Sequence, residues 1–487
     1  MISVASHGEV MRSDVTKNTL TQFGEITMEE GRLDVNAEMP TDGKSGSVVI
    51  LGGQFFMDNS KIQTLGDAGT GDIKIVSTEQ LQVVDSSIEM KNKLGNGGKI
   101  VLHGQNIELD GGEIISQSIG QGQGGSIEMK ATNAVNMDTS TLMAVTFDDG
   151  NSGDINIEVN DLALTNGAQI NASSDGNGKS GTITINAETI NINGYHEENG
   201  TKNPSGIASS AFSNGNGNTI YISAHSLNLD NWATIQTLTK GEGNAGDISI
   251  NVHDLRITNG ADIDASNEGT GDGKGGNIKI TAMNSVLITA QFGEDESKFV
   301  VKEGFLGGIF SIANNHGEGG NIELTTRELI LRNSGVISVG SEGTGDAGNM
   351  TLNVGGKLNL DNAAILTKSQ QVGGDISIKN PDFFTVNKSQ ILANAINKDG
   401  GNIRIIAEQF IKSSDSFLDA SSELGIDGSV HIGDELVVLP RHFLRARLQK
   451  QCATILREDK SHFVRVNWLG VPRDELEGGV LGSHHDL

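Results

Sequence analysis

The sequence holds few of the residues that stabilise small or compact domains. Its single cysteine, Cys452, rules out a disulfide within the chain, and only 5 prolines occur among 487 residues. Aromatic residues amount to 4% of the chain, so a large core has to be aliphatic. No segment approaches the roughly 18 consecutive apolar residues of a transmembrane helix, and we therefore expect no membrane insertion.

Basic residues are also scarce. The chain has 35 Lys and Arg against 62 Asp and Glu, which gives a formal net charge of −27 at pH 7. Proteins that bind nucleic acids or anionic membranes need clustered Lys and Arg. We therefore expect no nucleic-acid partner, and the strong negative charge favours a protein that is soluble outside a cell.

A secretory signal peptide is not visible either, because Met1–Leu20 lacks a basic start followed by an apolar run. The chain either stays inside the cell or is the downstream piece of a longer exported protein. We expect the second, since the first repeat, near Gly24, has no polar cap before it, and solenoids normally cover their open strand edges. The alternative is that residues 1–23 fold over this end.

Glycine, by contrast, is abundant, with 65 residues, and it marks a repeat. In the motif Gly153–Ile157, apolar residues follow a glycine two and four positions later, and this frame returns along almost the whole chain. Its copies begin at Gly24, Gly46, Gly71, Gly98, Gly125, Gly153, Gly181, Asn218, Gly246, Gly276, Gly320, Gly348, Gly374, Gly401 and Gly428. Most steps are 25 to 30 residues, which indicates a stack of one supersecondary unit.

Each repeat contains three apolar pairs, and one residue separates the two members of each pair, as in a half-buried strand. In one clear copy the pairs are Ile155/Ile157, Leu162/Leu164 and Ile170/Ala172. Three short strands per repeat, each paired with its equivalent in the next, predict an all-β, right-handed parallel β-helix of about 15 coils. Between the second and third pairs, Asn166-Gly167 predicts a sharp corner, because Asn and Gly accept left-handed backbone.

The β-helix repeat region is predicted to span residues 1–436, with insertions near 194–212 and 290–311. Insertions in a solenoid form loops on one face, where partners often bind. The second insertion contains four phenylalanines, Phe292, Phe299, Phe305 and Phe310. Three interpretations stay open: these rings pack the insertion onto the rod, they form part of a further coil, or they bind a partner.

Residues 437–487 are predicted to form a small C-terminal capping module. Between Val437 and Pro472 seven Lys or Arg residues accompany two acidic ones, so this segment carries a net positive charge, unlike the chain as a whole. Arg441–Gln451 has apolar residues at helical spacing, which predicts a short helix over the last coil. A flexible tail follows it. A nucleic-acid or membrane role for these basic residues is the less favoured alternative.

A row of neighbouring carboxylates would indicate a polysaccharide-cleaving β-helix. The position after the repeated glycine supplies Asp72, Asp154, Asp247 and Asp375, but no two of them fall on adjacent coils. The same position holds Asn277, Asn321, Asn349 and Asn402, which predict an amide ladder. Metal-ligand spacings and nucleotide-binding motifs are missing from the sequence. We therefore expect no catalytic residue, no metal and no cofactor, and the sequence assigns no binding residues.

The repeats resemble a known family. Gly153–Ser173 and Gly246–Ser266 share Gly-Asp-Ile-x-Ile and Asn-Gly-Ala-x-Ile-x-Ala-Ser, as in filamentous-haemagglutinin-type exoproteins of two-partner secretion. Asn203–Ser210 is similar to an insertion that recurs in that family. Cys452, Ser461–Val464 and Gly470–Pro472 are similar to its C-terminal motifs. The resemblance covers roughly residues 24–473. Two features depart from it: the family's amino-terminal secretion domain is missing, and its Gly-Arg-Gly-Gly reads Asn467-Trp468-Leu469-Gly470 here.

The resemblance implies that the chain is passed outward, unfolded, by an outer-membrane β-barrel transporter. It implies a secreted or surface location in a Gram-negative bacterium or cyanobacterium. We therefore expect a non-enzymatic, adhesin-like rod that attaches to host or neighbouring cell surfaces, glycans or matrix. Two alternatives remain: a β-helical polysaccharide lyase or hydrolase, and a purely structural filament or matrix protein.

Overall fold

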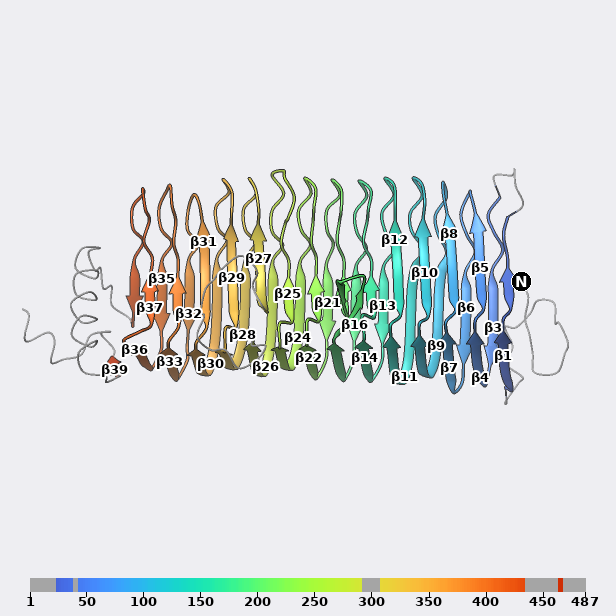
Figure 1. Cartoon of the computed structure of the whole chain (residues 1–487), viewed down its shortest axis with the longest axis horizontal. Coiled ribbons are helices and arrows are strands. Elements are labelled where there is room, and N and C mark those ends of the chain that lie inside the picture. Colours follow the sequence, from blue (N-terminus) through green and yellow to red (C-terminus); the bar gives the residue numbers. More distant parts are fainter. Residues whose placement is uncertain (1–22, 38–42, 291–306, 434–462, 467–487) are drawn as a thin grey trace, which may run out of the picture.

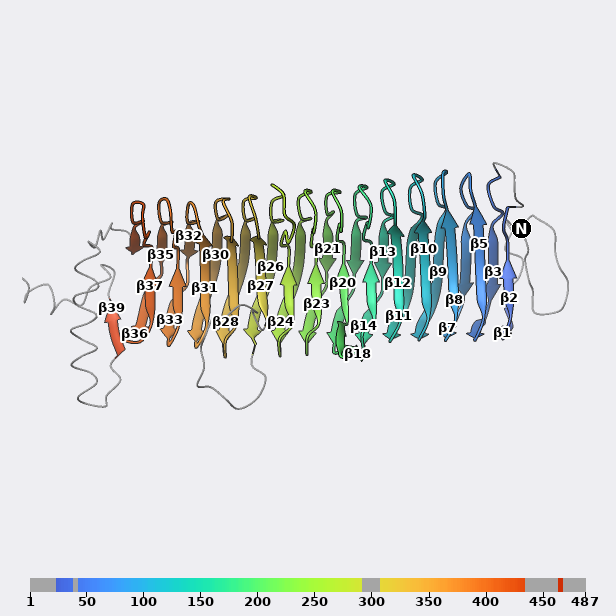
Figure 2. The same ribbon diagram turned by 45° about the horizontal axis from the view of Figure 1, so that its top comes forward.

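The computed structural model describes residues 23–37, 43–290, 307–433 and 463–466. These residues form a long rod in which short strands are stacked side by side from one end to the other (Figure 1). Chain order follows the rod axis, so each circuit of the chain, or coil, lies on the previous one (Figure 2). The described residues contain no helix, and therefore none long and apolar enough to cross a membrane.

Each coil contributes strands at a first, a second and a third position. The strands at the third position form one 14-stranded parallel sheet, called here the third sheet. Its strands are β2 (Arg32–Asp34), β5 (Lys61–Gly66), β8 (Ser87–Asn92), β10 (Glu113–Ser118), β12 (Thr141–Thr146), β15 (Gln169–Asn171), β20 (Gly206–Ala208), β23 (Thr234–Gln236), β25 (Asp262–Asp264), β27 (Gly308–Ala313), β29 (Val336–Ser341), β31 (Ala364–Ser369), β34 (Gln390–Leu392) and β37 (Phe417–Asp419).

The first and second positions belong to a 23-stranded sheet. Six strands run through both positions: β9 (Lys99–Asp110), β11 (Ser126–Asp138), β24 (Ile248–Thr258), β26 (Ile278–Thr289), β28 (Ile322–Arg332) and β30 (Met350–Asp361). The other first-position strands are β3 (Val48–Gly52), β6 (Ile73–Ser77), β13 (Ile155–Glu158), β16 (Ile183–Asn186), β21 (Ile220–Ser223), β32 (Ile376–Lys379), β35 (Ile403–Ile406) and β38 (Val430–Ile432). The other second-position strands are β1 (Glu25–Glu29), β4 (Gln54–Asp58), β7 (Gln80–Val84), β14 (Asp161–Thr165), β17 (Thr189–Asn193), β22 (Ser226–Asp230), β33 (Phe383–Asn387) and β36 (Gln409–Ser413).

Equivalent residues of successive coils pair in parallel register. Ile155 of β13 pairs with Ile183 of β16, and Ile170 of β15 pairs with Ile207 of β20. The predicted all-β parallel β-helix is therefore confirmed. The described residues hold 14 strands at the third position, so the rod has about 14 turns where the sequence predicts 15.

The difference arises at the first predicted repeat, which the sequence pattern places at Gly24. β1 contains Ile26 and Met28, which that pattern assigns to a first strand. In the structure β1 pairs with the second-position strand β4, and Ile26 lies opposite Phe55. Apolar residues alternate in the same way at all three positions, so spacing alone does not distinguish them. The assignment of Gly24 to the start of a coil is therefore wrong.

Inward-facing aliphatic side chains form continuous columns along the rod. Ile155, Leu162 and Ile170 come from the three positions of one coil, and all three are fully buried. Because the strands pair in register, their equivalents lie directly above and below them. Burial of each Ile or Leu contributes about 1.5–3 kcal/mol. The columns join into one core that extends along the rod.

The corners between second and third strands have left-handed backbone, as predicted. Asn166 and Asn259 have φ values of 53° and 51°, a conformation that Asn adopts more readily than most residues. The repeated glycine is required for a different reason, which is steric. A Cβ atom on Gly181 would lie 1.9 Å from the carbonyl oxygen of Gly153 in the preceding coil. Close stacking of the backbone therefore excludes a side chain there.

The first predicted insertion, 194–212, contains a hairpin. β18 (Tyr195–Glu198) and β19 (Thr201–Pro204) pair antiparallel and belong to neither large sheet. The chain rejoins the regular coil at β20, which pairs with β15 and β23. The inserted residues therefore end before Gly206, and Asn203–Ser210 is divided between the hairpin and the coil.

The second predicted insertion, 290–311, lies mostly outside the described residues, and so do Phe292, Phe299 and Phe305. Phe310 is described: it lies in β27, is 5% exposed and packs with Val336 and Leu366 of the next coils. This ring therefore belongs to the regular third sheet.

The predicted C-terminal module, 437–487, also lies outside the described residues apart from β39 (Phe463–Val466), and this applies to the expected helix over Arg441–Gln451 and to Cys452. β39 pairs antiparallel with β36. The edge of β36 that faces the end of the rod thus has a hydrogen-bonded partner from the C-terminal segment.

Replacing Ile250 by Asp tests the inward direction of the columns. Ile250 is 1% exposed and lies between Ile222 and Ile280 of the adjacent coils. A carboxylate at this place loses its hydration without gaining a partner, so we expect the free energy of unfolding to fall by about 3 kcal/mol or more. Urea denaturation followed by circular dichroism measures the change. Ser249→Asp, on the outward side of the same strand, is the control, and an unchanged curve for Ile250→Asp would contradict the inward placement.

Candidate functional site

Side chains that follow the repeated glycine bind the backbone of the next coil. Asp154 Oδ1 accepts a hydrogen bond from the Thr182 backbone N–H at 2.8 Å. Asp247 Oδ1 accepts from the backbone N–H and from Nδ2 of Asn277, at 2.7 and 3.1 Å. The predicted amide ladder continues at Asn321, whose Nδ2 donates to Asn277 Oδ1 at 3.0 Å. This column therefore serves to hold the coils in register.

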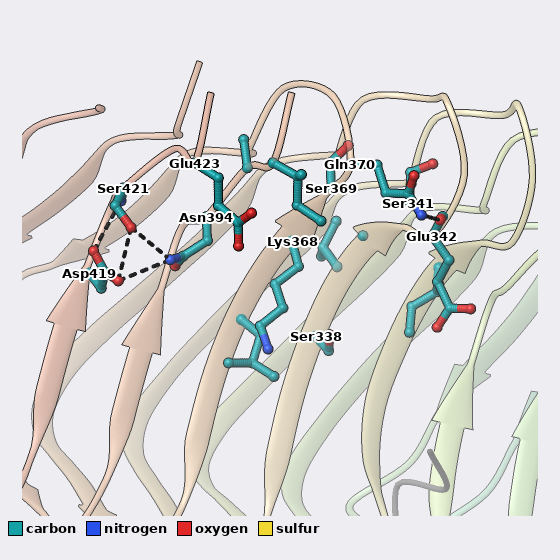
Figure 3. Close-up of a pocket in the computed structure, with 16 residues that line it drawn as sticks. Ser338, Ser341, Glu342, Lys368, Ser369, Gln370, Asn394, Asp419, Ser421 and Glu423 are labelled. Carbon is teal, nitrogen blue, oxygen red and sulfur yellow. Dashed lines mark hydrogen bonds between the residues drawn. The ribbon is translucent and has the colours of Figure 1, made fainter. Parts of the chain in front are cut away.

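A groove of about 550 Å³ lies on the outer face of the third sheet (Figure 3). It runs over β29, over β31, over Asn394–Ile396 just after β34, and over the end of β37, so it extends across successive coils along the rod axis. Alternation along each strand turns every second side chain toward it. Its charged and polar lining residues include Glu342, Lys368, Asn394, Asp419, Ser421 and Glu423. We call this feature the groove.

One wall of the groove is a hydrogen-bonded triad of side chains. Asn394 Nδ2 donates to Asp419 Oδ2 at 3.0 Å and to Ser421 Oγ at 3.2 Å, and Ser421 Oγ donates to Asp419 Oδ2 at 3.0 Å. Figure 3 shows the three residues side by side on neighbouring coils. Asn394 Oδ1 is buried and has no hydrogen-bond partner in the described part of the chain. This oxygen is closed to solvent, so it is not among the groups that the groove offers to a ligand.

Lys368 supplies the positive charge of the groove. Its Nζ makes no ion pair and no hydrogen bond with the other described residues. Loss of hydration within the groove lowers the pKa of the Lys368 ammonium below its ordinary value. Glu342 and Glu423 are exposed and lie one coil before and two coils after Lys368 along the rod axis. Three carboxylates, counting Asp419, thus accompany a single ammonium.

An apolar cluster adjoins the groove on the same outward face. Phe310, Val336, Ala364 and Leu366 are 0–5% exposed, although strict alternation predicts polar residues at these outward positions. The sequence contains a signal for them, because apolar residues stand next to one another at Val336-Ile337 and Ile365-Leu366. Such runs break the period of two and mark strands that are buried on both faces.

A pair of aspartates lies on the same sheet, nearer the middle of the rod. Asp262 and Asp264 occupy the two outward positions of β25, between Thr234 and Gln236 of β23 and Gly308 and Phe310 of β27. Burial raises the pKa of Asp262 to about 6 and, together with the charge of Asp262, raises the pKa of Asp264 to about 7. Hydrogen bonds to Asp262 from Thr234 Oγ1 and to Asp264 from the Ser266 backbone N–H oppose these shifts.

The position after the repeated glycine gives no sign of this pair, because both aspartates lie in a third strand. The signal is Asp-x-Asp within a third strand, where the equivalent outward positions of the two adjacent coils carry uncharged residues such as Thr234 and Gln236. Two carboxylates at positions i and i+2 of a strand point to the same side. The described residues contain no group of three or more His, Cys, Asp and Glu side chains that could hold a metal ion.

The β18–β19 hairpin is fixed to the rod by aromatic and polar contacts. Lys202 Nζ lies 4.5 Å from the centroid of the Tyr195 ring and 4.6 Å from that of the Trp232 ring, which belongs to the next coil. On the other side, Ser205 Oγ accepts a hydrogen bond from the Gly167 backbone N–H at 2.9 Å. The hairpin therefore contacts the coils on both sides of its own.

Asn277→Asp tests whether the column after the glycine tolerates adjacent carboxylates. The change places a carboxylate beside Asp247 and removes the donor that binds it. We expect the free energy of unfolding to fall by about 0.5–1 kcal/mol at pH 7. The loss should shrink in about 1 M NaCl, because salt screens the repulsion between the two carboxylates. Thermal unfolding at low and at high salt measures it. Asn277→Ala, which lacks the added charge, is the control and should show no such salt dependence.

Asp264→Asn tests the raised pKa values. Between pH 4 and 7 the folded chain keeps a proton on Asp264 that the unfolded chain has released, so the free energy of unfolding falls as pH rises through this window. Asparagine at position 264 does not titrate, so the variant lacks this contribution to the pH dependence of the free energy of unfolding. At pH 8 the variant should be more stable than the wild type by at least about 1 kcal/mol. Urea unfolding at pH 4, 6 and 8 provides the measurement, with Asp148→Asn in an exposed loop as control. An identical slope in the wild type and in Asp264→Asn would refute the assignment.

No family model, no curated protein and no solved structure matches the chain. The resemblance of Gly153–Ser173 and Gly246–Ser266 to haemagglutinin-type exoproteins therefore stays a prediction. The function has to be inferred from the rod and from its outward-facing residues.

Proposed function

We propose that the protein is a non-enzymatic, adhesin-like rod, secreted or exposed on a cell surface, that mediates attachment to cells, glycans or matrix. The observation that carries the proposal is the groove. It is a depression of about 550 Å³ on the flank of the rod, where charged and polar side chains from four coils stand beside apolar ones such as Leu366 and Ile396. Such a surface suits recognition of an extended ligand.

The form of the rod supports this role. Fourteen coils about 4.8 Å apart give a length of roughly 65 Å with the same cross-section throughout. The inward residues are nearly constant, whereas the outward residues of the third sheet differ from coil to coil, as Thr234, Asp262 and Gly308 illustrate. A constant interior with a varied exterior suits a scaffold that presents different surfaces along its length.

The proposal includes export through an outer-membrane β-barrel transporter, as the resemblance implies. Strand pairing between the coils joins each one to its immediate neighbours, so the coils can form in sequence as the chain emerges. The location that follows is the surface or surroundings of a Gram-negative bacterium or cyanobacterium.

A second candidate function is hydrolysis of a polysaccharide, and Asp262 and Asp264 favour it. Glycosidases use two carboxyl groups, one of which is protonated near neutral pH and acts as the acid. The pKa of about 7 for Asp264 fits that requirement. However, the hydrogen bond from Thr234 to Asp262 lies within the sheet surface, and the pair lies outside the groove. We therefore favour attachment.

Binding and cleavage assays on the same preparation distinguish the two functions. We expect the folded protein to bind to cells or to a glycan array and to release no reducing or unsaturated ends from neutral and acidic polysaccharides. Release of ends that Asp264→Asn abolishes would favour the hydrolase. Absence of both binding and cleavage in a well-folded preparation would favour a purely structural filament.

A further inference from the structure

We infer that the groove binds a neutral oligosaccharide through its hydroxyl groups and discriminates against polyuronates of the same length. The inference deepens the proposed attachment function and rests on it. It follows from the hydrogen-bonding groups of the groove, from their charges and from their spacing along the rod.

The groove contains charged side chains that have no partner among the described residues, namely Lys368, Glu342 and Glu423. The ammonium of Lys368 has three N–H donors and no acceptor among the described residues. An ionised Glu342 or Glu423 only accepts hydrogen bonds. A hydroxyl group both donates and accepts, so a ligand with several hydroxyls can satisfy all of these groups at once.

The charges of the groove disfavour an anionic ligand. Glu342, Asp419 and Glu423 outnumber Lys368, so the groove carries a net negative charge when all four are ionised. A chain of uronic acids would bring several further carboxylates into this space, and like charges at close range oppose association. An apolar ligand would leave the polar groups desolvated and unpaired. A neutral saccharide avoids both costs.

The spacing of the lining groups suits an extended ligand. The lining groups come from the coils of β29, β31, β34 and β37, so they repeat at about 4.8 Å over roughly 14 Å along the rod axis. A linear oligosaccharide also carries its hydroxyls at regular intervals along one direction. Ile396 is 41% exposed and lines the groove, and it offers an apolar surface to the C–H face of a sugar ring.

Isothermal titration calorimetry of the full chain tests the inference with three probes of equal length: cellohexaose, hexa-N-acetylchitohexaose and hexagalacturonate. We expect at least one of the neutral hexasaccharides to bind and hexagalacturonate to bind at least about tenfold more weakly or not at all. Raising the salt concentration should leave the neutral affinity unchanged, because no ligand charge is screened.

Three variants locate the binding. Lys368→Ala should weaken binding of the neutral probe about fivefold to tenfold, as expected for one lost hydrogen bond. Lys179→Ala, a matched change of an exposed lysine in a distant loop, should leave it unchanged. The double change Glu342→Gln and Glu423→Gln keeps the shape and removes two negative charges, so it should strengthen binding of hexagalacturonate more than that of the neutral probes.

Two outcomes would overturn the inference. The first is tighter binding of hexagalacturonate than of both neutral probes. The second is equal binding by Lys368→Ala and the wild type. If the protein attaches to cells but binds no hexasaccharide, the inference fails and the proposed function stands. If a neutral hexasaccharide binds in the groove while attachment to cells and glycan surfaces is absent, the proposed function fails and the ligand class stands.

Discussion

Backbone hydrogen bonding between equivalent residues of successive coils is the constraint on which the rest of the structure depends. Parallel pairing in register brings each residue next to its own equivalent, so a side chain that fits at one level has to fit beside a copy of itself. Aliphatic residues such as Ile155 and Ile183 satisfy this condition on the inside. At the repeated glycine the backbones of two coils come so close that Gly181 leaves no room for a Cβ atom above Gly153. Asp247 and Asn277 use the same stacking to bind the next backbone amide.

The same constraint separates stability from recognition. The inward columns and the side chains after the glycine determine whether coils stack, whereas most outward side chains on the third sheet, apart from the cluster around Phe310, lie outside the core. Exposed outward positions can therefore carry charged and polar groups without disturbing the columns. In the groove these groups converge from four coils, and in β25 two carboxylates stand together with raised pKa values. The proposals of attachment and of a neutral saccharide ligand both depend on this freedom.

The parallel β-helix was predictable from the sequence because its cause is periodic. The glycine frame, the three apolar pairs and the corner residues such as Asn166 recur once per coil, and the structure has them as expected. The position of Ile26 was not predictable, because all three strands share one alternation. The groove was not predictable either: Lys368, Asn394 and Ser421 are each about one coil apart in the sequence and follow no pattern. For residues that do not repeat, spatial proximity can be recognised only when the register of the strands is known.

The β18–β19 hairpin has a mechanical consequence. Hydrogen bonds between coils run along the axis, so a pull on the two ends of the rod would load them directly and detach one coil after another. At the corners, serine side chains add bonds to the preceding coil, as Ser140 does to the Gly112 backbone N–H and Ser205 to that of Gly167. The hairpin adds a contact of another kind, because Lys202 Nζ lies 4.6 Å from the centroid of the Trp232 ring in the next coil. Tension would have to break this contact, as well as the strand pairing, before these two coils could separate.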